Sequence, residues 1–292
     1  MQNSDRKGSL YMVAASICWS FGGLCIKFIP WGAMSIIGLR ALLAAAVFVI
    51  FRKSFKVELT RGNVMAAVCL SATNILFVFA NKLTTAAAAI LLQFTAPIFI
   101  ILINLVFYRK RPERSAVLAV AVTFLGMLLF FADGLKSGSL PGNILAVLSG
   151  LAFAGVFVCN KRPDTNTENA LFLGFLINAV IGLPFAFFQV SADALAWGAV
   201  LFLGIVQVGL AYVFFSLGIK RTTALLACLI TAMEPVLNPV WVMLAGILGW
   251  LPEVETPGTY AVAGGVVIVL TVIWYNIHVE RQTTGRPSEP TI

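Results

Sequence analysis

The chain has 292 residues, of which 60% are hydrophobic and 11% are charged, and its mean hydropathy is +0.96. Soluble domains average about 45–50% apolar and about 25% charged residues. The composition therefore excludes a soluble globular protein, because too few charged groups exist to cover a surface exposed to water. The net charge of +8 is explained below by membrane topology, so nucleic acid is not an expected partner.

Ten apolar segments are long enough to cross a bilayer as helices, which takes about 20 residues. The links between them are short and leave no room for a separate soluble domain. The predicted fold class is an all-α membrane protein with ten transmembrane helices, at residues 9–29, 33–51, 63–81, 87–107, 115–132, 141–160, 170–189, 195–217, 223–248 and 258–277.

The two ends of the chain are polar. The N-terminal stretch 1–9 precedes a long apolar segment without a clear small-residue cleavage site, so we expect a retained first transmembrane helix and not a signal peptide. The C-terminal stretch 281–292 contains prolines and few apolar residues. It is predicted to be a disordered cytoplasmic tail.

The basic residues indicate the orientation. Most of the 20 Lys and Arg residues fall in segments on one side of the predicted membrane, at 6–7, 52–61, 109–114, 161–162, 220–221 and 281–286. Loops rich in Lys and Arg face the cytoplasm, and anionic lipids of the inner leaflet attract them. We therefore predict a multi-pass protein of the cell membrane with both termini in the cytoplasm.

An internal repeat divides the chain. KLTTAAAAILLQFTAP at 82–97 recurs as KRTTALLACLITAMEP at 220–235, 138 residues later. The same offset pairs Gly126 with Gly264, and an offset of 134 pairs Trp19 with Phe153. The predicted repeats are 1–136 and 137–280, with five helices each. Because five is odd, the second copy starts on the opposite side, and such inverted repeats are typical of secondary transporters.

Glu234 is the most informative polar residue, because a charge inside a membrane is costly. It lies near the middle of the ninth predicted span, and its counterpart in the first repeat is Ala96. The fold alone therefore does not require an acid there. One interpretation is a protonatable group that couples proton movement to transport or neutralises a cationic substrate. The other is a structural carboxylate that bonds backbone donors around Pro235.

Arg40 and the matched prolines have two interpretations each. Arg40 lies within the second span, and its counterpart is the polar Asn178, which favours a structural role over direct anion binding. Pro97 and Pro235 occupy equivalent positions and should kink their helices. They are either paired gating elements or static kinks, and Asn238 with Pro239 is expected to break the ninth span further.

Uncharged polar residues within the spans complete the candidate substrate site. Trp19, Tyr212 and Trp241 offer rings that can stack on a planar or cationic substrate. The other candidates are Ser16, Ser20, Asn74, Gln93, Thr95, Asn160, Gln207, Thr231 and Asn238.

The sequence lacks the motifs of several common enzyme classes. The only histidine, His278, lies at the inner end of the last span, and no HExxH, GxSxG or P-loop pattern occurs. The 5 cysteines are odd in number and form no CxxC, so neither a disulfide framework nor a zinc site is indicated. No catalytic residue, metal or cofactor is expected.

Several motifs resemble the drug/metabolite transporter superfamily in its EamA-type branch. They are the stretch Ser16–Gly22 (SICWSFG), Gly38-Leu-Arg40, Thr95-Ala-Pro97, Met233-Glu234-Pro235, and the stretches that contain Gly126 and Gly264. The resemblance covers nearly the whole chain. The loop after the fourth span, Tyr108–Pro112, lacks the family's usual acidic residue. The resemblance implies a gradient-driven exporter of small metabolites, with a cavity formed mainly by spans 1, 3, 4, 6, 8 and 9.

The sequence thus predicts a secondary active transporter of the bacterial inner membrane that works by alternating access. Its expected substrates are small metabolites such as amino acids, or related and drug-like compounds. Two alternatives stay open: an importer or facilitator of a sugar or sugar derivative, and a non-transporting membrane scaffold. A polar cavity between the halves would separate a transporter from a scaffold. The sequence leaves the oligomeric state open, a monomer included.

Overall fold

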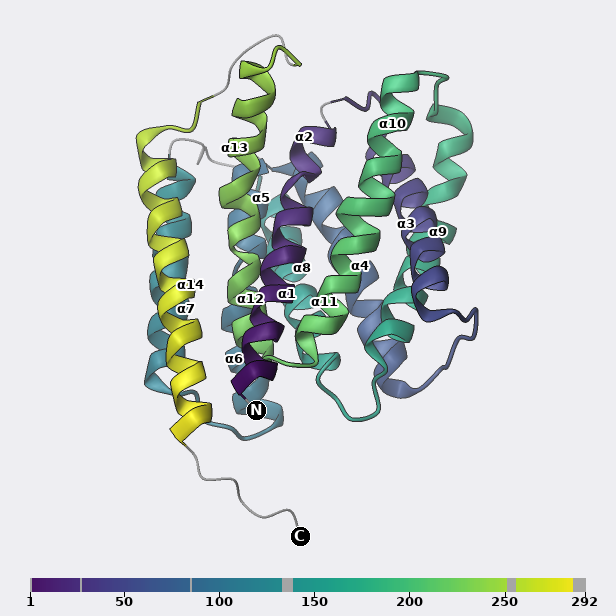
Figure 1. Cartoon of the computed structure of the whole chain (residues 1–292). Helices are drawn as coiled ribbons and strands as arrows, with labels where there is room; N and C mark the ends of the chain where they lie inside the picture. The colour runs from purple at the N-terminus through teal and green to yellow at the C-terminus, as the bar shows by residue number, and fades with distance from the viewer. Residues whose placement is uncertain (1, 27, 85, 133–138, 251–255, 286–292) are drawn as a thin grey trace.

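The structure is a computed structural model that describes residues 2–26, 28–84, 86–132, 139–250 and 256–285. Throughout these ranges the regular structure is helical (Figure 1). The first half contains α1 (Gln2–Ser20), α2 (Gly22–Ile26), α3 (Ala33–Arg52), α4 (Arg61–Leu83), α5 (Ala86–Gln93), α6 (Ala96–Phe107) and α7 (Arg114–Phe130). The second contains α8 (Leu140–Cys159), α9 (Thr167–Gln189), α10 (Ala194–Phe202), the π-helix η2 (Leu203–Leu210), α11 (Ala211–Ile219), α12 (Ala224–Thr231), α13 (Met233–Ile247) and α14 (Thr259–Gly285).

Nine stretches of the described helices are long and apolar enough to cross a membrane. They match nine of the ten predicted spans, and α1 with α2, α5 with α6, α10 with η2 and α11, and α12 with α13 each form one stretch. The remaining prediction, 115–132, corresponds to the shorter apolar helix α7. An all-helical protein with many spans is therefore confirmed, whereas the count of ten stays a prediction.

Two boundaries differ from the sequence predictions. Helix α14 continues to Gly285, so the first residues of the predicted disordered tail are helical, and 286–292 lie outside the described residues. Helix α13 runs through Pro239, which corrects the expected further break at Asn238 and Pro239. The carbonyl that loses its backbone partner to a proline lies one turn earlier, and here that loss does not end the helix.

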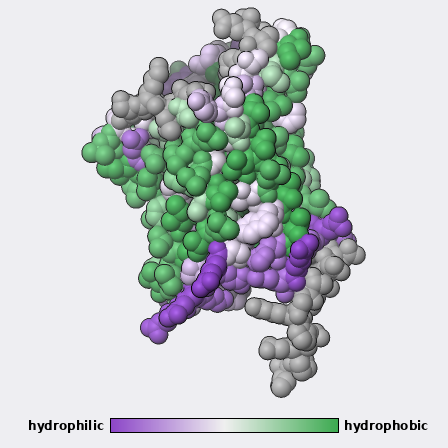
Figure 2. All heavy atoms as spheres, turned by 90° about the vertical axis from the view of Figure 1, so that its left-hand side faces the viewer, coloured by the Kyte–Doolittle hydropathy of each residue, from purple (hydrophilic) through white to green (hydrophobic). Residues whose placement is uncertain are grey.

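The helices stand side by side along one axis, and α1 begins at the same end of the molecule at which α14 finishes (Figure 1). Long apolar side chains such as Phe187 and Phe188 face outward and are almost fully exposed. The face over α7 and α14 shows a hydrophobic belt with hydrophilic residues gathered below it (Figure 2). An exposed apolar belt of this kind is the surface that lipid would cover.

The interior is built mainly from small and aromatic residues. Its largest cluster joins α1, α3, α4 and α6–α9 with α11–α14, and Phe48, Phe157, Phe175 and Phe215 in it are fully enclosed. Helix α3 packs along α9, α4 along α8, and α7 along α14. The two halves therefore interdigitate, and residues of both reach the centre of the molecule.

Candidate functional site

A cavity of about 140 Å³ lies in the interior where the two halves meet. By volume this is room for roughly four or five waters. Its walls come from the predicted spans 1, 3, 4, 6, 8 and 9, and also from spans 2 and 7. The lining residues are Trp19, Ile37, Arg40, Ala41, Thr73, Asn74, Phe77, Gln93, Phe153, Phe175, Asn178, Gln207, Val208, Tyr212 and Glu234.

Two opposite charges face this cavity from different halves. Arg40 projects from α3, and its Nη2 donates to Asn74 Oδ1 at 3.5 Å. Glu234 lies in the first turn of α13, where the helix dipole favours a negative charge. The Arg40 guanidinium and the Glu234 carboxylate attract each other electrostatically, with Tyr212 close to both. An isolated charge at this depth would be unfavourable, and the opposite charge of the partner partly offsets that cost.

Side-chain amides add acceptors that the protein itself does not satisfy. Gln207 lies in the π-helix η2 and donates from Nε2 to the Trp19 carbonyl at 3.2 Å. Its Oε1 is enclosed and has no hydrogen-bond partner, and the same holds for Asn178 Oδ1. Buried polar atoms without partners are rare and call for a ligand or water. π-Helical turns often occur at functional sites, and this one aligns Gln207 with the cavity.

Aromatic rings form one wall. The Trp19 and Tyr212 ring centroids are 5.0 Å apart, and Tyr212 also lies 5.3 Å from Phe175. Both contacts are edge-on, an arrangement that rings favour. Another part of the lining is polar: Gln93 Nε2 donates to Ser149 Oγ at 2.8 Å, and Ser149 donates to the Thr73 carbonyl. The cavity thus combines fixed rings with hydrogen-bonding groups.

The cavity contains residues at equivalent positions of the two repeats. Trp19 faces it with its counterpart Phe153, Arg40 with Asn178, and Asn74 with Tyr212, which follows it by 138 residues. Sequence reasoning missed Thr73, Phe77, Phe153, Phe175 and Asn178 as lining residues. The repeat offset was the signal that could have found Phe153, since its counterpart Trp19 was already a candidate; Arg40, the counterpart of Asn178, had been predicted to be structural.

A model of the EamA-like transporter family matches the chain twice, over residues 6–132 and 140–277. The chain belongs to the EamA-like transporter family. An EamA-like chain is a membrane transporter, which agrees with the polar cavity inside an apolar belt.

Two named relatives are exporters. The EamA-like chain is 24% identical over 280 residues to the pseudopaline exporter of Pseudomonas aeruginosa, covering 92% of this chain and 95% of that protein. It is 24% identical over 244 residues to the threonine/homoserine exporter of Escherichia coli, covering 81% and 80%. A solved crystal structure of a protein with 20% identity superposes with a TM-score of 0.77 over 94% of this chain and 98% of that one. That likeness concerns the fold alone.

Several predicted site residues lie elsewhere in the EamA-like fold. Ser16 donates to the Met12 and Ile230 carbonyls, which joins α1 to α12. Ser20 accepts from Trp241 Nε1 at 2.7 Å, which joins α1 to α13. Thr231 and Thr95 donate to carbonyls of their own half-helices. Of the described residues that line the central cavity, none is Ser16, Ser20, Thr95, Thr231, Asn238 or Trp241.

Asn160 takes part in a different pocket. It follows α8 and lines a polar space of about 520 Å³ at the end of the molecule where α9 starts. Its Nδ2 donates to the Val156 carbonyl at 2.7 Å, while its Oδ1 is enclosed without a partner. Asn160 lies about two helical turns beyond Phe153, the α8 residue that lines the central cavity.

The matched prolines stand at the start of second half-helices. Pro97 follows the break between α5 and α6, and Pro235 follows the break at Ala232 between α12 and α13. A proline in the first turn lacks only an N–H that would have no intrahelical partner. Glu234 precedes Pro235 directly, so the interruption of the ninth span carries the carboxylate to the cavity.

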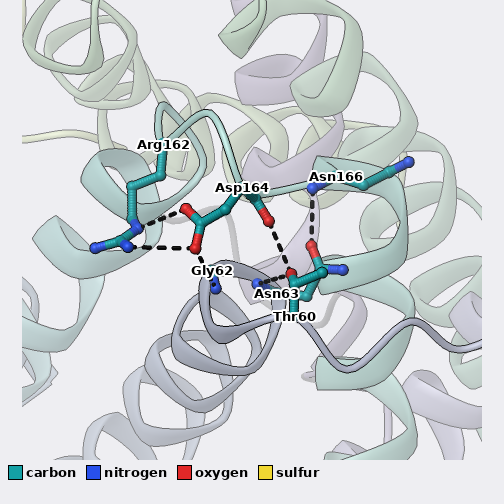
Figure 3. A network of polar contacts seen from close by, with 6 residues as sticks. All are labelled: Thr60, Gly62, Asn63, Arg162, Asp164 and Asn166. Carbon is teal, nitrogen blue, oxygen red and sulfur yellow. Dashed lines mark hydrogen bonds and ion pairs between the residues drawn. The ribbon is translucent and has the colours of Figure 1, made fainter.

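A network of polar contacts joins the two halves (Figure 3). It lies at the basic end of the molecule, which is the end that carries the basic segments such as 52–61 and 161–162. Asp164 accepts from Arg162 and from the Gly62 N–H at 3.0 Å, and its carbonyl accepts from Thr60 Oγ1 at 2.8 Å. Asn166 N–H donates to Asn63 Oδ1 at 2.8 Å. We call Thr60, Gly62, Asn63, Arg162, Asp164, Asn166 and the adjacent Asn169 the loop network.

Asn169 makes more hydrogen bonds between the two halves than any other member of the loop network. From the first turn of α9, its Oδ1 accepts from Arg52 Nη2 and from the Glu58 N–H, each at 3.1 Å. Its Nδ2 donates to the Glu58 carbonyl at 2.7 Å. All three bonds cross between the halves. Elsewhere in the network, the Arg162 guanidinium bonded to Asp164 holds the pKa of that carboxyl below its usual range.

In the part of the chain that the structure describes, no three His, Cys, Asp or Glu side chains gather where they could hold a metal ion. The 5 cysteines are unbridged, and three of them are buried. The chemistry that the central cavity offers is therefore charge complementarity, hydrogen bonding and ring stacking.

Proposed function

We propose that this EamA-like transporter exports small zwitterionic molecules of the amino-acid type across a bacterial inner membrane by alternating access. One observation carries the proposal: the central cavity is lined by Arg40 and Glu234 together with Asn178 and Gln207, whose enclosed amide oxygens have no partner. A scaffold with a merely ancestral repeat would have a dry, apolar core at this place. A polar cavity with unsatisfied acceptors instead favours a site for a ligand.

The lining groups complement a zwitterion. A guanidinium binds a carboxylate in a planar, two-bond arrangement, so Arg40 would hold the carboxylate of the substrate. An ammonium group donates three hydrogen bonds, and Glu234 with the oxygens of Asn178 and Gln207 would accept them. The Trp19 and Tyr212 rings would contact the rest of the molecule. A sugar would leave both charges without partners. The substrates for which the exporter relatives are named, threonine, homoserine and pseudopaline, support this chemistry.

We further propose ten membrane crossings in two inverted halves. Helix α7 has 17 residues, about 26 Å at 1.5 Å per residue, which is at the short limit for a crossing. It packs along α14, its counterpart in the second repeat. Where they cross, a Cβ on Gly264 would meet the Gly126 carbonyl oxygen at 2.5 Å. A contact between equivalent residues is what a two-fold axis through this crossing predicts.

Alternating access then assigns roles to the breaks and to the loop network. With the basic end in the cytoplasm, the loop network holds α3 and α4 against α8 and α9 on the cytoplasmic side. Opening that side requires these bonds to break. The half-helices that begin near Pro97 and Pro235 would tilt toward opposite faces, and Glu234 would exchange its proton or a substrate amine between the two states.

The proposal is tested by measuring metabolites inside and outside cells that overexpress the chain. We expect extracellular accumulation of one or a few amino-acid-type compounds, at least tenfold lower with Arg40→Gln at equal membrane level. Arg109→Gln, which removes a charge at the exposed basic end, serves as the matched control and should export like the wild type. If no zwitterion leaves the cells faster, or if Arg40→Gln exports normally, the proposed substrate class is wrong.

A further inference from the structure

A second cavity, of about 300 Å³, lies at the basic end of the molecule where α12 begins, whereas Glu234 follows the other end of α12. This volume is at the lower limit of typical ligand pockets. It is bounded by the start of α1, the end of α8, the segment between α11 and α12, and the end of α14. Its lining residues are Ser9, Lys161, Lys220, Arg221, Thr222, Thr223, Leu226, Asn276, Val279 and Glu280.

Three cations and one acid face this space. Lys161 Nζ donates to the Ile219 carbonyl at 2.9 Å, and Arg221 Nη1 donates to the Leu217 carbonyl at 3.0 Å. Each uses one of several N–H groups in this way. Lys220 is paired with Glu168 at 2.6 Å, outside the cavity. Glu280 is the acid among the lining residues, so the charge of the lining groups stays positive.

Thr222 lines this cavity, is 9% exposed, and has an enclosed hydroxyl with no hydrogen-bond partner. Beside it, Thr223 caps the N-terminus of α12 and accepts from the Leu226 N–H at 3.1 Å. An unpartnered buried hydroxyl is unfavourable, and here it stands next to a helix N-terminus and the two cations Lys161 and Arg221. All of these features favour an anionic group with acceptor oxygens.

At the equivalent place in the first repeat, the threonine hydroxyl has a hydrogen-bond partner. The counterpart of Thr222 is Thr84, whose Oγ1 donates to Asn143 Oδ1 at 2.8 Å. At an offset of 134, Asn143 corresponds to Ser9. The shorter Ser9 side chain donates instead to Asn276 Oδ1 at 2.6 Å, and Thr222 has no partner.

In both copies, the helix that carries the glycine lies equally close to the segment before the threonine. A Cβ on Gly142 would meet Thr84 N at 2.8 Å, and one on Gly8 would meet the Arg221 carbonyl carbon at 2.9 Å. The difference therefore lies in the side chains. Between the two copies, Asn143 is replaced by the shorter Ser9, and Leu83 is replaced by Arg221. The site at Thr84 has an internal hydrogen bond, whereas the site at Thr222 has a cavity and the additional positive charge of Arg221.

We propose that this second cavity binds a phosphate group, either the headgroup of an anionic lipid or a free phosphate compound. Arg221 and Lys161 would bind its oxygens, and a rotation of the Thr222 side chain would bring its enclosed hydroxyl to the phosphate. The cavity lies at the end of the hydrophobic belt, where lipid headgroups and cytoplasmic solutes both have access. The site is distinct from the central cavity and does not depend on the transported substrate.

The first variant introduces at position 9 the asparagine that the second repeat has at position 143. Ser9→Asn should restore the hydrogen bond to Thr222 that Asn143 makes to Thr84. It should fold normally and bind phosphate at least tenfold more weakly. Thr222→Val removes the unpartnered hydroxyl at nearly constant volume. It should not lower the melting temperature without ligand, and it should weaken binding similarly. Ser115→Asn, beside the separate basic segment 109–114, is the matched control and should bind like the wild type.

Two probes separate the sources of phosphate. The purified full chain in maltoside detergent is titrated with inorganic phosphate against chloride at equal ionic strength, with binding measured by calorimetry. In parallel, native mass spectrometry compares retention of phosphatidylglycerol with that of diacylglycerol, which lacks the phosphate. Binding of either probe that is lost in Ser9→Asn and Thr222→Val supports the site, and the probe that binds identifies the source. If neither probe binds, or if both variants bind like the wild type, the site does not exist.

Discussion

Removing the Asn169 side chain should open the side of the transporter that we propose to be cytoplasmic. The three hydrogen bonds from Asn169 to Arg52 and Glu58 all join the two halves, and Asn169 is fully buried. Each such bond contributes about 0.5–1.5 kcal/mol net. In a conformation open to the cytoplasm the same groups would bond to water, so Asn169→Ala penalises only the closed form. A loss of about 3 kcal/mol shifts the ratio of the two forms by about a hundredfold.

Cysteine accessibility measures this shift. Thr73→Cys places a small thiol on the wall of the central cavity, in a background that lacks the five native cysteines. A membrane-impermeant maleimide is added to vesicles of known sidedness. Asn169→Ala should raise the labelling rate from the cytoplasmic side at least tenfold and lower it from the outside.

Asn166→Ala is the control for this experiment. Its side chain accepts from the Asn169 N–H within the first turn of α9, so its loss costs about 1 kcal/mol of helix capping and breaks no side-chain bond between the halves. Labelling with Asn166→Ala should resemble the wild type. Equal labelling of both variants, or no change with Asn169→Ala, would refute the role of the loop network as an inner gate.

Three further predictions concern coupling, gating and pH. Glu234→Gln should abolish the dependence of transport on a pH gradient in proteoliposomes at normal protein level, and full pH-dependent transport by this variant would remove Glu234 from the mechanism. Pro97→Ala and Pro235→Ala should shift the same cysteine labelling in opposite directions, whereas identical shifts or none would mean that the prolines only shape the fold. Arg162 and, from the other half, the Gly62 N–H lower the pKa of Asp164. Only the Gly62 bond depends on closure, and it stabilises the closed loop network above the usual aspartate range, near 4, until the pH falls through the lowered pKa. Cytoplasmic labelling should therefore rise in acid, and a variant with Asp164→Asn should show no such rise.

Much of the fold could be predicted because hydropathy reports directly on which segments cross a membrane. Apolar length placed nine of the predicted spans on helices that the structure contains. It could not settle α7, whose 17 residues are short for a crossing. It also did not predict that α13 would run through Pro239, because packing against α1, α2 and α14 supports a helix that local preference disfavours.

The candidate site was predictable only in part. Arg40, Asn74, Gln207, Tyr212 and Glu234 share the cavity, because a polar residue within an apolar span has few other places to face. Sequence alone does not tell such a residue from one that bonds a neighbouring helix. Ser16 and Ser20 satisfy their hydroxyls locally and at helix contacts, as short polar side chains in helices commonly do.

Solute counterflow tests the central claim most directly. Proteoliposomes that contain the purified chain are loaded with one unlabelled amino acid at a time and diluted into a trace of the same labelled compound. We expect transient, saturable uptake of at least one labelled zwitterion. This uptake should be lost with Arg40→Gln and normal with Arg109→Gln. Absence of counterflow for every zwitterion, or counterflow that Arg40→Gln leaves unchanged, would contradict a transport site between Arg40 and Glu234.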